Sequence, residues 1–188
     1  MRILLFVMIL FQGFASSAIR FGDSVPYNVS NSSIVRLNSN CTGIFVKENI
    51  ILTAAHCTNP GATSLAIWRR TESRTQSANI DSSAIRVLST DLNKELALLK
   101  VDLSHFSVKM GLFENPESYP VIHSQEVKSG SVLDIYGYGL NFDPTIGDRK
   151  LTVGKVKYLR DTEDEEVEAV PVSSQLACLG DSGGPVFL

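Results

Sequence analysis

A histidine and a serine stand in two short segments whose residue types suit nucleophilic catalysis. His56 lies in the run Thr-Ala-Ala-His-Cys at residues 53–57, and Ser182 lies in the run Gly-Asp-Ser-Gly-Gly-Pro at residues 180–185. A serine hydroxyl is a weak nucleophile until a positioned base removes its proton. Glycines around a serine let the backbone turn so that its N–H groups face one point, where an oxyanion can form. The two segments therefore predict a general base and an activated serine.

These segments resemble the signatures of the trypsin/chymotrypsin-like serine proteases. The resemblance covers most of the chain after residue 18, and it includes two cysteines sixteen residues apart, Cys41 and Cys57. Residues 94–100, Lys-Glu-Leu-Ala-Leu-Leu-Lys, resemble the strand of that family that carries the third catalytic residue. Residues 137–139, Gly-Tyr-Gly, resemble the aromatic Gly-x-Gly that opens the loop of the second barrel. The resemblance implies the family's fold and a serine-type endopeptidase activity on protein or peptide substrates.

The resemblance also implies a role for each matched position. His56 would be the general base and Ser182 the nucleophile. The backbone N–H groups of Gly180 and Ser182 would form the oxyanion hole. Asp181 would pair with a freshly exposed N-terminal amine, for which the candidate is Ile19. No cofactor and no metal are expected.

The third catalytic residue is less settled, because the family has an aspartate where this chain has Glu95. Its task is to accept the second N–H of the histidine ring, which fixes the tautomer and stabilises the imidazolium. Glutamate has the same charge and one more methylene, so the chemistry allows it while the geometry must adjust. Asp91, four residues earlier, is a competing candidate, and a third alternative is that no working third residue exists.

The cysteine count is odd, since Cys41, Cys57 and Cys178 are the three in the chain. By resemblance, Cys41 and Cys57 would form a disulfide beside the histidine. The family continues for several strands beyond the catalytic serine, whereas this sequence ends six residues after it, at Leu188. We therefore interpret the chain as truncated at its C-terminus, so that the partner of Cys178 and part of the substrate pocket are absent.

One position of the substrate pocket can be compared with the family. Leu176 occupies the position, two before Cys178, where trypsin-type members place an aspartate that receives Lys or Arg. A leucine there argues against a preference for basic substrates.

The N-terminus has the pattern of a signal peptide. A basic start at Arg2 precedes an apolar run over residues 3–11, which is too short to cross a bilayer. Ser16 and Ala18 supply the small residues of a cleavage site that would expose Ile19 directly. Cleavage after Ala15 is the competing outcome, and a buried N-terminal helix is the alternative to a signal peptide. We expect a secreted protein, extracellular or, in a bacterium, periplasmic.

The remaining sequence predicts an all-β fold. Apolar runs of strand length recur with turn residues between them, and no window keeps a helical period. The predicted strands cover residues 43–46, 50–53, 65–68, 85–88, 96–101, 132–138 and 151–159. With the resemblance, this predicts two antiparallel β-barrels of the chymotrypsin-like type, the second incomplete at the C-terminus. The predicted boundaries are a signal peptide at 1–18 and a peptidase domain at 19–188, with the first barrel at about 19–115 and a partial second barrel at about 116–188.

Composition excludes some partners and leaves a rival function open. The formal net charge of -3 gives no basic face for nucleic acid. No run after residue 18 is long and apolar enough to span a membrane, so no membrane association is expected once the signal is removed. The rival is a non-catalytic serine-protease homologue, or an inactive truncated fragment, that acts as a binding or regulatory protein.

Overall fold

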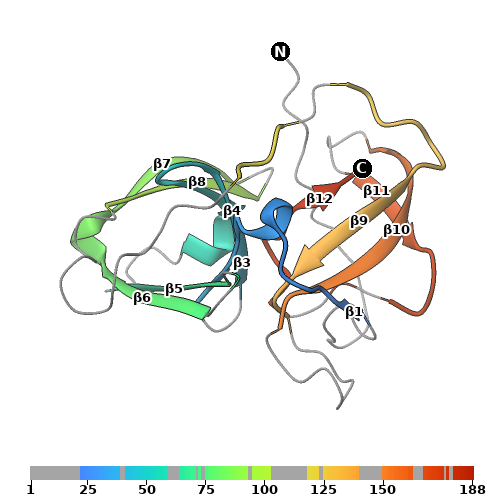
Figure 1. Cartoon of the computed structure of the whole chain (residues 1–188). Helices are drawn as coiled ribbons and strands as arrows, with labels where there is room; N and C mark the ends of the chain where they lie inside the picture. Colours follow the sequence, from blue (N-terminus) through green and yellow to red (C-terminus); the bar gives the residue numbers. More distant parts are fainter. Residues whose placement is uncertain are drawn as a thin grey trace.

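The computed structural model describes residues 22–38, 41–58, 64–70, 72, 75–92, 95–102, 118–122, 125–139, 150–162, 167–175, 177 and 180–188. The described residues form two antiparallel sheets that lie side by side (Figure 1). Their helical turns are three short 3-10 segments, η1 (Val29–Asn31), η2 (Ala55–Thr58) and η3 (Ser82–Ala84). No helix among these residues is long and apolar enough to cross a membrane.

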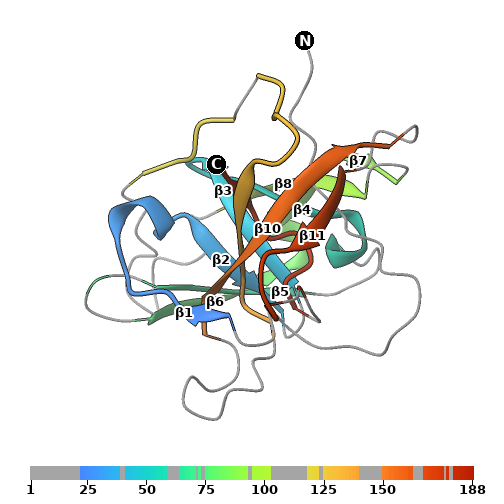
Figure 2. The ribbon, with the colours of Figure 1, turned by 90° about the vertical axis from the view of Figure 1, so that its right-hand side faces the viewer.

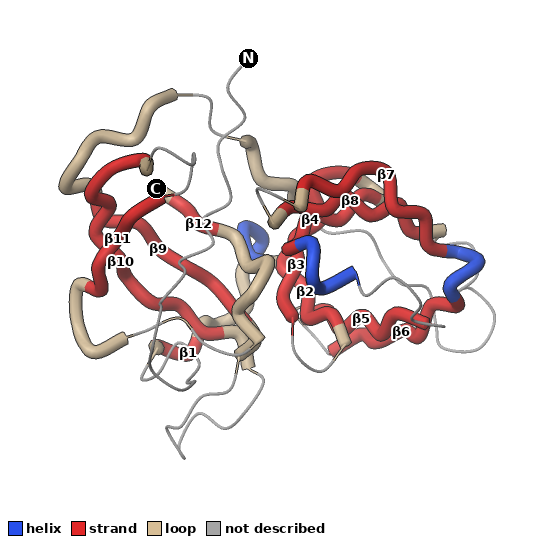
Figure 3. The backbone as a smooth tube through the Cα atoms, turned by 180° about the vertical axis from the view of Figure 1, so that it is seen from behind, coloured by secondary structure: helices blue, strands red, loops and turns tan. Residues whose placement is uncertain are grey.

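The first sheet has seven strands in the order β6-β5-β2-β3-β4-β8-β7 and curls around its own core (Figure 3). Its strands are β2 (Ile34–Leu37), β3 (Cys41–Lys47), β4 (Ile50–Ala54), β5 (Ser64–Arg70), β6 (Thr75–Asp81), β7 (Ile85–Asp91) and β8 (Leu96–Val101). The side chains of Phe45, Ile51, Ile67 and Leu99 are almost fully buried inside the curl. Burial alternates along β8, as it does in a strand with one face on a core.

The second sheet has five strands, and its central strand is the long β10. Its strands are β1 (Asp23–Ser24), β9 (Val132–Gly137), β10 (Thr152–Asp161), β11 (Val167–Pro171) and β12 (Val186–Phe187). β10 pairs with β9 along one edge, and with β1 and then β11 along the other. Every second side chain along most of β10 faces the core of this sheet. Val156 and Tyr158 are on that face, and they pack on Leu133, Ile135 and Ala169.

A third apolar cluster joins the two sheets. Ile34 and Ile44 come from the first sheet, while Tyr138, Leu151 and Val25 come from residues next to strands of the second. Figure 2 shows β10 and β11 in front of strands of the first sheet. Each of these side chains is at most 8% exposed. The two sheets therefore meet in a buried apolar interface that fixes their relative position.

The all-β prediction is confirmed, and all seven predicted strands are present as β3, β4, β5, β7, β8, β9 and β10. The structure adds β1, β2, β6, β11 and β12. β1 belongs to the second sheet, because Asp23 and Ser24 pair with Val153 and Thr152. A two-residue strand carries no periodicity of its own, so only the partner strand reveals it.

Candidate active site

His56 lies on η2, the single turn that follows β4. The turn is closed by the Thr58 hydroxyl, which donates a hydrogen bond to the Ala55 carbonyl (2.7 Å). The first N–H of the turn is that of Ala55, and it donates a hydrogen bond to the carbonyl of Glu95 (2.8 Å). The side chain of His56 is 45% exposed, so its ring is open to a ligand from solvent while its backbone is held.

A disulfide fixes the end of the same turn. Cys57 is bonded to Cys41 at the start of β3, with 6.0 Å between the two Cα atoms. This is the pairing that the resemblance implies. Both sulfur atoms are consumed by the bond, so although they lie close to His56 they are not thiolate ligands for a metal.

Glu95 contacts His56 twice through one carboxylate oxygen. Oε2 lies 3.2 Å from Nδ1 of the imidazole and accepts a hydrogen bond from the His56 backbone N–H, also at 3.2 Å. A carboxylate oxygen can only accept, so this contact favours the tautomer with its proton on Nδ1. Nε2 is then left with a lone pair, which is the state that a general base requires.

The backbone of Glu95 is unusual, because its φ is +52°. A non-glycine residue in this left-handed region costs about 1–2 kcal/mol. The cost is offset by three contacts that this conformation makes with η2, one from the Glu95 carbonyl and two from Oε2. The pairing of Leu96 with Ala54 brings Glu95 beside the turn that carries His56.

The competing candidate, Asp91, lies on the strand next to β8. Asp91 ends β7 and is paired with Leu96 of β8. Asp102 follows β8, where its N–H donates to the Ala84 carbonyl and its side chain is exposed. The carboxylate that contacts the imidazole is that of Glu95.

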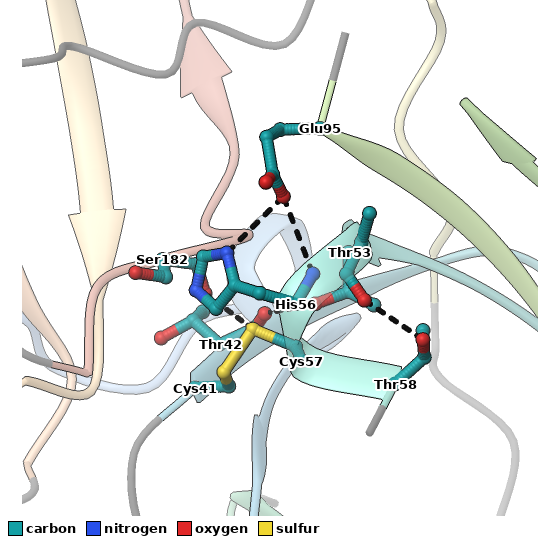
Figure 4. A network of polar contacts seen from close by, with 9 residues as sticks. Cys41, Thr42, Thr53, His56, Cys57, Thr58, Glu95 and Ser182 are labelled. Atoms are coloured by element: carbon teal, nitrogen blue, oxygen red, sulfur yellow. Dashed lines mark hydrogen bonds and ion pairs between the residues drawn. A yellow bond between two sulfur atoms is a disulfide. The ribbon is translucent and has the colours of Figure 1, made fainter. Parts of the chain in front are cut away.

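Ser182 is held next to this turn by its backbone carbonyl. The Ser182 carbonyl accepts a hydrogen bond from the Thr42 N–H of β3 (2.8 Å) and lies 3.7 Å from Sγ of Cys57. Figure 4 shows the imidazole of His56 with the Glu95 carboxylate on one side and Ser182 on the other. The residues on either side of His56 therefore come from different sheets, and the contact between the sheets brings them together.

Glycines are required on both sides of the serine. Gly183 has φ +78°, and a Cβ there would lie 2.6 Å from the Ala54 nitrogen. Gly180 has φ +102°, and a Cβ there would lie 2.7 Å from the Gly139 Cα. Side chains at these positions would clash with backbone and strain φ, so the serine loop is shaped by its glycines.

Asp181 points toward the Gly-Tyr-Gly segment at residues 137–139. Its Oδ1 accepts a hydrogen bond from the Gly139 N–H (2.9 Å). A Cβ on Gly137 or Gly139 would collide with this carboxylate, so the two glycines make room for it. Ile19, the predicted partner of Asp181, lies outside the described residues, as do Leu176 and Cys178.

Thr42 and Tyr138 also belong to this region, although the sequence analysis predicted no role for either side chain. The Tyr138 N–H donates to the Thr42 hydroxyl (2.9 Å), and the Tyr138 ring is buried between the sheets. Burial raises the pKa of the Tyr138 hydroxyl to about 12. The Gly-x-Gly segment points to Tyr138, but a single threonine beside a cysteine forms no pattern that points to Thr42.

A protein-family model described as Trypsin matches residues 18–188, which is nearly the whole chain. A search of curated proteins finds no match.

Proposed function

Since the chain belongs to the trypsin family, we propose that it is a secreted serine endopeptidase that cleaves peptide bonds through an acyl-enzyme on Ser182. The observation that carries the proposal is the contact of the Glu95 carboxylate with Nδ1 of His56. It leaves Nε2 as a base on a ring that is open to solvent, beside a serine on a glycine-shaped loop. The Cys41–Cys57 disulfide is of the kind found in exported proteins, and it supports secretion.

In the first half of the reaction, the Ser182 oxygen attacks the carbonyl carbon of the scissile peptide and passes its proton to Nε2 of His56. The carbonyl electron pair moves onto oxygen, where the N–H groups of Gly180 and Ser182 donate to it. Glu95 stabilises the positive charge that forms on the imidazole. His56 then gives its proton to the leaving nitrogen, the C–N bond breaks, and an ester on Ser182 remains.

The second half repeats these steps with water. A water molecule attacks the ester carbonyl carbon and gives a proton to Nε2 of His56. The oxyanion forms in the same place, and its collapse breaks the bond to Ser182. His56 returns the proton to the serine oxygen, so the enzyme regains its first state and a carboxylic acid is released.

We further propose that the active form begins at Ile19, whose amine pairs with Asp181. The proposal is supported by the match to the family's pattern and by Gly137 and Gly139, which leave room beside this carboxylate. N-terminal sequencing of the secreted protein is expected to read Ile-Arg-Phe-Gly. A mature protein that is active and begins at Ser16 would contradict this pairing.

A fluorophosphonate probe tests the proposed function. The probe reacts with a serine whose proton is taken by a base, and it leaves ordinary serines untouched. We expect one label per folded chain, no label on Ser182→Ala, and little on His56→Ala. The matched control is Ser89→Ala, which removes an exposed serine of β7 and is expected to label like the wild type. A folded wild type that takes no label would contradict the proposal and favour a non-catalytic homologue.

A further inference from the structure

We infer that Thr42 is a positioning residue for the oxyanion loop, residues 180–182. It touches neither the substrate nor the reacting atoms in the mechanism above. It acts by holding the peptide groups whose N–H donors receive the oxyanion. The inference rests on the proposed function and extends it to a residue of the opposite sheet.

The Thr42 hydroxyl forms a bridge between two backbone groups of the second sheet region. Oγ1 accepts a hydrogen bond from the Tyr138 N–H (2.9 Å) and donates to the Gly180 carbonyl (2.6 Å). An N–H can only donate and a carbonyl can only accept, so the single hydroxyl proton must point at Gly180. Thr42 is 0% exposed, so water has no access to replace either bond.

The backbone of Thr42 holds the other end of the same loop. Its N–H donates to the Ser182 carbonyl (2.8 Å), while its own carbonyl accepts from the Thr53 hydroxyl (2.7 Å). One residue of β3 therefore binds both Gly180 and Ser182. Because β3 pairs with β2 and β4, Thr42 lies on an interior strand of the first sheet.

Such a bridge matters most at Gly180. A glycine with φ +102° has no Cβ to restrict its ψ, so the peptide plane that follows it is free to rotate unless something holds the carbonyl. The hydroxyl of Thr42 holds that carbonyl. The planes on either side carry the N–H groups of Gly180 and Ser182, so a rotation at Gly180 would misdirect the oxyanion donors.

The test compares variants at Thr42 by the kinetics of fluorophosphonate labelling. Thr42→Val keeps the shape and removes the hydroxyl, and Thr42→Ser keeps the hydroxyl. Removing one oxyanion donor outright costs about 10²–10³-fold in rate, and we expect a smaller loss, about 10–100-fold, when the donors are only misdirected. The loss should fall on the maximal labelling rate and leave the probe concentration for half-maximal rate unchanged. Thr42→Ser should recover the wild-type rate to within about threefold.

Thr152 provides the matched control. Its hydroxyl is also buried and also donates to a backbone carbonyl, that of Gly137 (3.3 Å), but it has no bond to the serine loop. We expect Thr152→Val to be labelled at the wild-type rate. If Thr42→Val is labelled as fast as the wild type, or if both valine variants lose the same factor, the inference is overturned.

Hydrogen exchange at the Tyr138 amide gives a readout that needs no catalysis. We expect this amide to be protected in the wild type and in Thr42→Ser, and to exchange at least about tenfold faster in Thr42→Val. Should Thr42→Val fail to fold, Thr42→Ala takes its place with the same expectations. A folded wild type that takes no label contradicts the proposed function itself, and equal Tyr138 exchange in all variants contradicts the bridge.

Discussion

Replacing Ser182 with alanine is expected to lower kcat for peptide hydrolysis by about 10⁶-fold, because no other group in the site forms the acyl bond. His56→Ala should lose nearly as much, since the serine oxygen then keeps its proton. The two residues act as one unit, so the double variant should lose no more than either single variant. The measurement is kcat on a chromogenic peptide, with a thermal unfolding curve to show that each variant is folded.

The unfolding curves distinguish a loss of chemistry from a loss of folding. Ser182 makes its contacts to the first sheet through its backbone carbonyl, and alanine keeps that carbonyl. The Tm of Ser182→Ala should therefore stay close to that of the wild type. A folded Ser182→Ala that keeps more than about one hundredth of wild-type kcat would show that the chemistry runs through another residue.

Glu95→Gln should lower kcat by about 10⁴-fold, which is the loss seen for the corresponding Asp→Asn change in the chymotrypsin-type triad. A glutamine keeps the size of the side chain, but its oxygen carries no charge. Its N–H₂ group can only donate, so where it faces Nδ1 the ring proton has no acceptor. The imidazole is then free to take the wrong tautomer, with its proton on Nε2. The measurement is again kcat, with KM expected to change little because Glu95 does not contact substrate.

Two further carboxylate variants separate length from charge. Glu95→Asp keeps the charge and shortens the side chain by one methylene, so we expect a loss between those of the wild type and Glu95→Gln. Asp91→Asn removes the competing carboxylate, whose backbone lies on β7, and should leave kcat unchanged. A loss under about tenfold for Glu95→Gln would mean that Glu95 does not orient His56, and a large loss for Asp91→Asn would assign that role to Asp91.

The local patterns of the sequence were enough to predict the all-β fold and seven of its strands. Residues 96–101 form an apolar run of strand length, and the structure has them as β8. The motifs around His56 and Ser182 are also local, because short turns, a disulfide and glycines shape them. Features that depend on residues close together in the sequence were therefore predictable.

What depends on distant pairing was not predictable. The choice between Glu95 and Asp91 turns on the register that places Leu96 opposite Ala54, and neither strand alone contains it. β1 exists only because residues 152–153 offer it an edge. Thr42 gains its role from two backbone groups 96 and 138 positions away, and no composition or spacing signals such a bond.

The central claim is that a covalent ester forms on Ser182 and that His56 and Glu95 drive its formation. The direct measurement is intact and peptide mass spectrometry of the secreted protein, quenched in acid within milliseconds of mixing with a slowly hydrolysed ester substrate. We expect an added acyl mass on the peptide that contains Ser182, absent in Ser182→Ala and strongly reduced in Glu95→Gln. Turnover of the ester with no acyl mass on Ser182, or with the mass on another residue, would contradict it.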